Sequence, residues 1–144
     1  MRVLVDTSIL VEIDRHNPRV VDLLKTLSEQ QTELLISTTT VAEILTGPYL
    51  RKDSQKSLEK ARDVLNQFEW VDLDGDVAAI LARLLAQVCL DSREIDYPDI
   101  IIAASAIHNS CDALLTLNKK DFVFFSQLKD ITYTPDEFPL QSRS

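Results

Sequence analysis

The sequence predicts an α/β fold of three layers, in which a mainly parallel central sheet lies between two layers of helices. Short apolar runs alternate with helical segments along the chain, as in proteins of this class. The first run, Arg2 to Val5, is continuously apolar, which is typical of a strand buried on both faces. The 144 residues are enough for a single core. We expect one domain over residues 1–134 and a polar tail over residues 135–144.

Each element has its own signal in the sequence. The strands are expected at Arg2 to Val5, Leu34 to Ile36, Trp70-Val71, Ala113 to Leu115 and Ile131 to Tyr133. The helices are expected from Ile9, from Pro18 behind an Asn17 cap, around Val41 to Leu45, over Asp53 to Phe68, over Val77 to Val88 and over Ile100 to Ile107. Gly47-Pro48 is expected to stop the third helix. The last helix is apolar nearly all round, which predicts burial on more than one side.

The composition argues against several classes of protein. A net charge of −8 is a poor footprint for a nucleic-acid binder, but it suits a protein that binds metal cations or a basic partner. With only Gly47 and Gly75, the chain can form neither a P-loop nor a dinucleotide fingerprint. It also lacks the GxSxG and HExxH motifs. Nucleotide cofactors, serine hydrolase chemistry and zinc protease chemistry are therefore not expected.

The sequence predicts a cytoplasmic protein. The longest uncharged run, Ile100 to Cys111, is well short of the roughly 20 residues of a membrane span, so no membrane association is expected. The N-terminus reaches Asp6 too early to be a signal peptide. Cys89 and Cys111 end apolar helical runs, and we interpret both as buried, reduced thiols.

Four acids stand where the predicted fold would gather them. Asp6 directly follows the first strand, and Glu43 lies one turn into the helix after the second. Asp121 comes shortly after the Ala113 to Leu115 strand, and Asp99 begins the buried helix. Ligands of parallel sheets bind at the carboxyl ends of the strands, where these acids would converge. Two carboxylates about 4 Å apart repel by roughly 4 kcal/mol, so the cluster predicts a hard cation such as Mg²⁺ or Mn²⁺.

Taken singly, each acid also has a simpler interpretation. Asp6 and Asp96 are residues that cap helices, and Asp99 would complement a helix dipole. Glu43 and Asp121 would ordinarily be solvated. The functional interpretation depends on the combination of these residues and on their placement.

Four segments carry a resemblance to a known family. They are VDTSILVE (Val5 to Glu12), TTVAEILTG (Thr39 to Gly47), PDIIIAASA (Pro98 to Ala106) and LLTLNKKDF (Leu114 to Phe122). In this order, and with one acid each, they resemble PIN-domain proteins, and the chain is most similar to the VapC-type toxins of toxin–antitoxin pairs. The resemblance implies a three-layer α/β/α PIN-like domain with a mainly parallel central sheet.

The resemblance implies a metal-dependent endoribonuclease that hydrolyses RNA phosphodiester bonds, leaving 5′-phosphate and 3′-hydroxyl ends. Asp6, Glu43 and Asp99 would hold Mg²⁺, for which Mn²⁺ could substitute, and Asp121 would complete a catalytic quartet. Supporting roles fall to Ser8, Thr116 and Asn118.

The resemblance also implies partners. Proteins of this kind form homodimers, and a small antitoxin protein neutralises them by placing a basic segment in the acidic site. The RNA substrate would need local basic patches, for which Arg51-Lys52 and Lys119-Lys120 are candidates beside the simpler interpretation of a solvated surface. The alternative function is a PIN-domain RNA-binding or regulatory protein that is not a toxin and is nuclease-inactive.

Two further motifs have simpler explanations. The acidic segment from Asp72 to Asp76 starts like a phosphatase motif, but only 68 residues remain after it, and we interpret it as a turn that caps the next helix. His108 and Cys111 have a spacing that could hold a metal, but no other soft ligands accompany them, and a helix end is the simpler interpretation.

Overall fold

The computed structural model describes residues 1–140, and it confirms the three-layer architecture. Within these residues, five strands form one parallel sheet in the order β3-β2-β1-β4-β5. The strands are β1 (Arg2–Val5), β2 (Glu33–Ser37), β3 (Glu69–Val71), β4 (Ala113–Leu115) and β5 (Thr132–Tyr133). The helices are α1 (Thr7–Asp14), α2 (Pro18–Glu29), α3 (Thr38–Tyr49), α4 (Ser54–Leu65), α5 (Gly75–Leu90), α6 (Tyr97–His108) and α7 (Lys119–Phe122).

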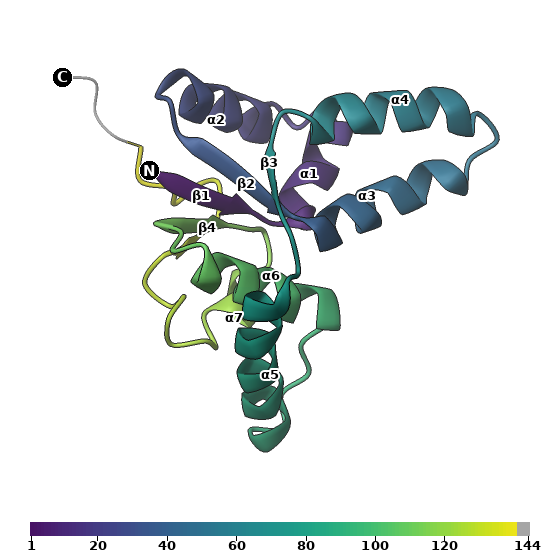
Figure 1. Cartoon of the computed structure of the whole chain (residues 1–144). Helices are drawn as coiled ribbons and strands as arrows, with labels where there is room; N and C mark the ends of the chain where they lie inside the picture. The colour runs from purple at the N-terminus through teal and green to yellow at the C-terminus, as the bar shows by residue number, and fades with distance from the viewer. Residues whose placement is uncertain (141–144) are drawn as a thin grey trace.

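The sheet separates two hydrophobic cores. Side chains alternate between the faces of a strand, so Val3 and Val5 of β1 join one core while Leu4 joins the other. Helices α1 and α2 cover the first face, and α5 and α6 cover the second (Figure 1). Helix α6 is buried along residues 100–106, which confirms that it packs on more than one side.

The order of the strands reverses beside β1. The chain builds β1, β2 and β3 toward one edge and then returns to place β4 on the other side of β1. Ligands of parallel sheets bind where the strand order reverses in this way. Val5 pairs with Leu115, so the residues that follow these two strands, Asp6 and Thr116, lie side by side at the reversal point.

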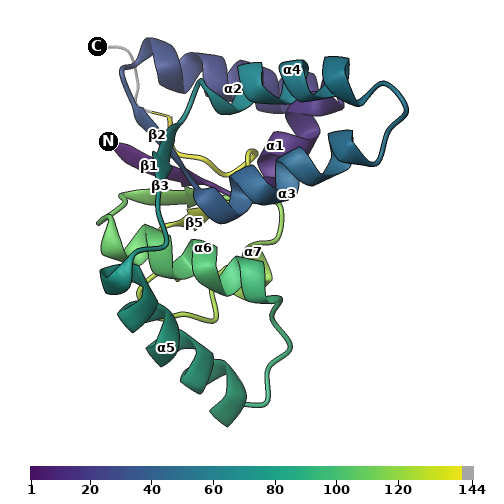
Figure 2. The same cartoon turned by 45° about the vertical axis from the view of Figure 1, so that its right-hand side comes forward.

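Helices α3 and α4 form a hairpin that projects beyond the sheet (Figure 2). Ser37 caps α3 by accepting a hydrogen bond from the backbone nitrogen of Thr39, at 3.1 Å. The expected stop at Gly47-Pro48 is wrong, because α3 continues to Tyr49. Gly47 does not adopt the positive φ that would end a helix, and Pro48 lies in the last turn, where its missing N–H removes only one hydrogen bond.

The two cysteines differ in their surroundings. Cys111 is buried as expected, and burial raises the pKa of its thiol to about 11, so the group stays protonated. The expectation for Cys89 is wrong, because its side chain is exposed. Helix α5 buries only one face, through Val77, Leu81, Leu84 and Val88, and the residue after Val88 points away from that face.

The C-terminal segment packs against the domain at least as far as Phe138. The Phe138 ring is 7% exposed and lies edge-on to Tyr133, with a centroid separation of 5.6 Å. It contributes to the core on the α1–α2 face. Residues 141–144 of the predicted tail lie outside the described residues. No helix among residues 1–140 is long and apolar enough to cross a membrane.

Candidate active site

Asp6 lies at the centre of the candidate site. Its side chain is 2% exposed, and its Oδ2 accepts hydrogen bonds from the Ser8 hydroxyl at 2.7 Å and the Thr116 hydroxyl at 2.8 Å. Asp6 occupies the N-cap position of α1, but its side chain makes no capping bond, so the simpler interpretation of this residue is wrong. Its Oδ1 is buried without a hydrogen-bond partner among the described residues. Only one of the two oxygen atoms of this carboxylate is therefore hydrogen-bonded to the described residues.

The two hydroxyl groups that hold Asp6 are themselves fixed. The Thr116 hydroxyl accepts a hydrogen bond from the backbone nitrogen of Asn118 at 2.9 Å, and the Ser8 hydroxyl accepts one from the backbone nitrogen of Leu117 at 3.1 Å. The hydroxyl groups of Ser8 and Thr116 each donate a hydrogen bond to Asp6 and accept one from the loop after β4. The predicted supporting residues thus tie α1 to this loop.

Glu43 approaches from α3. Its side chain is exposed, and its Oε1 accepts a hydrogen bond of 2.8 Å from the hydroxyl of Thr7, the first residue of α1. The Thr7 hydroxyl also contacts the hydroxyl of the buried Thr40 at 2.8 Å. Glu43 is therefore linked to the helix that follows Asp6.

Asp99 enters the site from the first turn of α6, and the pKa of its carboxyl is raised. Burial raises its pKa from 3.8 to about 7, and the charges of Asp6, Asp121, Asp96 and Glu43 add to this shift in that order. The carboxyl of Asp99 therefore interacts electrostatically with the other three predicted members of the quartet. Asp96 occupies the N-cap position of α6 but makes no capping bond with its side chain, and its charge also raises the pKa of Asp99.

Asp121 is linked to Asp99 by a shared amide. The Asn118 Nδ2 donates to Asp121 Oδ2 at 2.7 Å and lies 3.4 Å from Asp99 Oδ2. Asp121 belongs to α7, a single helical turn, and its side chain is partly buried. Phe122, the next residue, is fully buried and anchors this turn in the core.

The sequence analysis assigned no role to Thr7 or Thr40, although both contribute to the site. Thr7 lies between Asp6 and Ser8 in the first family-like segment, and its position there was a usable signal. Thr40 gave no such signal, because it is one of three consecutive threonines. Only the packing of α1 against α3 distinguishes it from its neighbours.

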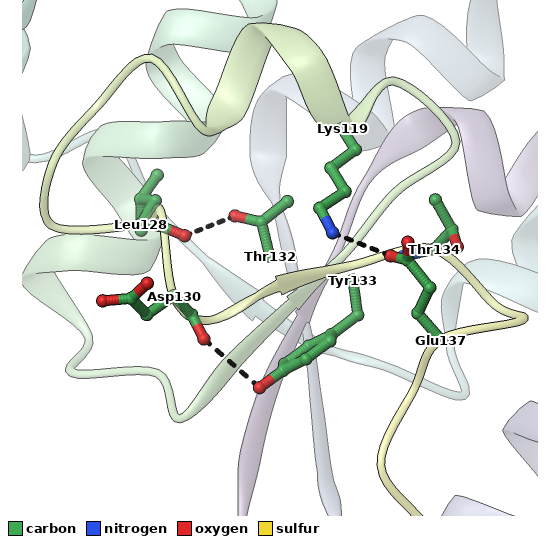
Figure 3. A network of polar contacts seen from close by, with 7 residues as sticks. All are labelled: Lys119, Leu128, Asp130, Thr132, Tyr133, Thr134 and Glu137. Carbon is green, nitrogen blue, oxygen red and sulfur yellow. Dashed lines mark hydrogen bonds and ion pairs between the residues drawn. The ribbon is translucent and has the colours of Figure 1, made fainter.

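The candidate basic patches differ in their availability. Lys119 forms an ion pair with Glu137 of the C-terminal segment, with 2.9 Å between Nζ and Oε2 (Figure 3). Arg51 forms an ion pair with Asp14, with 3.8 Å between Nη2 and Oδ2. Lys52 and Lys120 are exposed, and no ion pair of either residue is identified among the described residues. The second residue of each pair is the better candidate for a phosphate contact.

A different acidic group lies at the opposite end of α6. Among the described residues, Asp74, Asp76 and His108 have potential ligand atoms within 4.8 Å of one another, and all three side chains are exposed. The Asp74 Oδ1 already accepts a hydrogen bond from the backbone nitrogen of Val77, which confirms that this segment caps α5. His108 ends α6 as expected, about 14 Å along the helix axis from Asp99.

The residues of the candidate site fit a divalent cation. The quartet offers only carboxylate oxygens, the ligands that Mg²⁺ and Mn²⁺ prefer. The unpartnered Oδ1 of Asp6 is buried, which is unfavourable for an anionic oxygen unless a positive group reaches it. The acids of the quartet are spaced more widely than those of the Asp74 cluster, and the charges of the other three raise the pKa of Asp99.

Two sequence comparisons show the family of this chain. The sequence profile of the PIN domain matches residues 3–128. Ribonuclease VapC19 from Mycobacterium tuberculosis is 32% identical over 126 residues, which are 88% of this chain and 96% of that protein.

Solved structures show the same fold. A structure of VapBC2 from Rickettsia felis, bound to a DNA fragment from the VapBC2 promoter, superposes with a TM-score of 0.83 at 24% identity over 93% of this chain and 98% of that one. FitAcB from Neisseria gonorrhoeae superposes with a TM-score of 0.76 at 28% identity over 94% and 99%. Because the sequence profile of the PIN domain matches nearly the whole domain, this chain belongs to the PIN-domain family.

Proposed function

We propose that this protein is an endoribonuclease that hydrolyses RNA phosphodiester bonds with a divalent metal ion, Mg²⁺ or Mn²⁺. The observation that carries the proposal is the buried Asp6 Oδ1 at the reversal point of the sheet, which has no hydrogen-bond partner within residues 1–140. The similarity to Ribonuclease VapC19 supports RNA as the substrate.

The proposed roles of the residues follow from their contacts. Asp6, Glu43 and Asp99 hold the metal ion, and Asp121 adds the fourth negative charge. When bound, such an ion lowers the pKa of a water molecule and neutralises charge on the phosphate. Ser8 and Thr116 fix the Asp6 carboxylate through its Oδ2 and leave its Oδ1 for the metal ion.

Asn118 supports the second half of the site. Its amide bonds Asp121 and lies near Asp99, so it keeps the two carboxyl groups at a fixed separation. Because Asp99 has a pKa of about 7, its carboxyl is about half protonated at neutral pH, and a bound cation would favour its ionised form. The exposed Lys52 and Lys120 are proposed to contact the RNA backbone.

We further propose that the protein acts as the toxin of a type II toxin–antitoxin pair in the cytoplasm. The superposed structures from Haemophilus influenzae and Klebsiella pneumoniae are described as VapBC-1 and as a toxin–antitoxin complex, respectively, which supports an antitoxin as the partner. We propose that a basic segment of this antitoxin occupies the acidic site and that the toxin is a homodimer. Light scattering of the purified chain tests the dimer, and co-purification with the product of the neighbouring gene tests the partner.

The enzymatic proposal is tested with purified full-chain protein and a labelled RNA. Cleavage is expected with Mg²⁺ or Mn²⁺ and is expected to stop on addition of EDTA. Asp6→Asn and Asp99→Asn should each abolish cleavage, whereas Asp76→Asn, which changes an exposed acid of the other cluster, should leave it unchanged. If Asp99→Asn cleaved as well as the wild type, the mechanism would be wrong. Binding of RNA without cleavage under all conditions would favour the nuclease-inactive regulatory alternative.

A further inference from the structure

We propose that Thr40 is a positioning residue for Glu43 and that it acts through the hydroxyl of Thr7. The inference rests on the proposed function, because it takes Glu43 to be a ligand of the divalent metal ion. It extends that function by assigning the geometry of this ligand to two hydroxyl groups outside the acidic quartet.

Three side chains form a continuous chain of hydrogen bonds between α3 and α1. Thr40 of α3 is fully buried, and its Oγ1 lies 2.8 Å from the Oγ1 of Thr7. The Thr7 hydroxyl in turn donates to Glu43 Oε1 at 2.8 Å. The chain starts in the protein interior and ends on an exposed carboxylate at the site.

The direction of each hydrogen bond can be assigned. A carboxylate offers only acceptors, so Thr7 must be the donor to Glu43. A hydroxyl has a single proton, so Thr7 has none left for Thr40 and must accept a hydrogen bond from it. The order is therefore Thr40 to Thr7 to Glu43. Hydrogen bonds that run in one direction strengthen each other, so Thr40 makes Thr7 a better donor.

The chain fixes a side chain that would otherwise be mobile. Glu43 is exposed, and a long side chain loses rotamer freedom when it binds a metal ion. Thr40 precedes Glu43 by one helical turn, so both side chains lie on the face of α3 that meets α1. Thr7 directly follows Asp6, so the same bonds hold Glu43 at a set position relative to the buried ligand.

A purely structural role for Thr40 would be to satisfy its own buried hydroxyl. That role would affect folding stability but would not depend on Glu43. The two roles are separated by measuring metal affinity in the presence and absence of the Glu43 carboxylate, alongside the thermal unfolding of each variant.

The experiment is a titration of the full-chain protein with Mn²⁺ alone, followed by electron paramagnetic resonance. Thr7→Val is expected to weaken Mn²⁺ binding about tenfold, and Thr40→Val by about three- to tenfold, as for other groups that orient metal ligands. Thr40→Ser keeps the hydroxyl and should restore binding. Thr132→Val is the matched control, because Thr132 is equally buried and its hydroxyl donates to the Leu128 carbonyl at 2.7 Å, away from the site.

The decisive comparison uses a Glu43→Gln background. The proposal predicts that Thr40→Val adds no further loss of Mn²⁺ affinity there. An equal loss in both backgrounds, or normal binding by both Thr7→Val and Thr40→Val, would overturn it. If Asp6→Asn weakens binding while the two threonine variants do not, only this inference fails. If Asp6→Asn and Glu43→Gln also bind Mn²⁺ normally, the metal site of the proposed function fails with it.

Discussion

The two ends of α6 carry two different acidic groups. At its N-terminus, Asp99 faces a buried Asp6 whose Oδ1 has no hydrogen-bond partner among the described residues, and burial raises the Asp99 pKa to about 7. At its C-terminus, His108 meets Asp74 and Asp76 in the open, and their ligand atoms lie within 4.8 Å of one another. The ligand atoms of the exposed group lie closer together than those of the quartet, but water solvates these side chains. The comparison teaches that burial of unbalanced charge, rather than proximity of acids, distinguishes a candidate metal site.

The largest expected contrast comes from removing one acid at each end. Asp6→Asn should weaken Mg²⁺-dependent RNA cleavage by more than about a hundredfold, because even groups that only orient metal ligands contribute about ten- to a hundredfold. Asp76→Asn should leave the rate unchanged. Rates measured with a labelled RNA under identical conditions check both variants, and a comparable loss in Asp76→Asn would remove the distinction between the two ends.

Asp99→Asn should separate activity from stability. We expect cleavage to be lost while the melting temperature of the metal-free protein rises, because the amide removes the repulsion from the neighbouring acids. Each kcal/mol of relief corresponds to about 3 °C in a domain of this size. Thermal unfolding in EDTA measures the effect, and Asp74→Asn, which alters the exposed cluster, is the control. A lower melting temperature for Asp99→Asn would contradict the repulsion.

The pH dependence of stability should reveal the carboxyl at the N-terminal end of α6. The folded protein keeps a proton on Asp99 up to about pH 7, whereas in the unfolded chain this carboxyl ionises near its usual pKa of 3.8. The unfolded state therefore binds fewer protons between these values, and the free energy of unfolding of the metal-free protein falls as the pH rises through the window.

Melting curves from pH 4.5 to 8, recorded in EDTA and again in Mg²⁺ without EDTA, check this expectation. The wild type should lose stability relative to Asp99→Asn as the pH rises, and the stabilisation by Mg²⁺ should grow over the same range because the ion then competes with fewer protons. Parallel curves for the two proteins would show that Asp99 does not titrate in this window.

The smallest expected effect concerns the support of α7 by the C-terminal segment. Glu137→Gln removes the contact with Lys119, the first residue of the helix that carries Asp121 (Figure 3). Exposed ion pairs contribute little, so we expect a fall in cleavage of about two- to fivefold at most. Asp130→Asn is a suitable control, because its side chain is exposed and only its backbone carbonyl contacts Tyr133. A larger loss in Glu137→Gln would show that α7 depends on this contact.

The sequence was sufficient to predict the layers, the parallel sheet and the acids at its edge. Continuous apolar strands such as Val3 to Val5 leave few alternatives, and a buried strand followed by an acid is a local pattern. The end of α3 was predicted wrongly because Gly47-Pro48 usually ends a helix, and here the backbone stays helical to Tyr49. Cys89 was assigned by the character of its neighbours, but its exposure depends on which face of α5 packs.

The fine structure of the site was beyond prediction because it depends on long-range pairing. Thr116 reaches Asp6 from 110 positions away, and Thr7 meets Glu43 only where α1 packs against α3. The sequence offers Lys119 as a contact for RNA, but Glu137, which lies 18 positions later, neutralises its charge. Such contacts follow from the strand order β2-β1-β4 and not from any spacing within the chain.

The pairing of β1 with β4 has a consequence for protein synthesis. Thr116, the partner of Asp6, leaves the ribosome 110 residues after it, and the acid Asp121 leaves later still. Contacts of such wide sequence separation are slow to form in folding. A nascent or truncated chain that lacks β4 therefore has only part of the site and cannot gather its acids. The order of strands in the sheet delays the assembly of the acids until β4 and the helix after it have been translated.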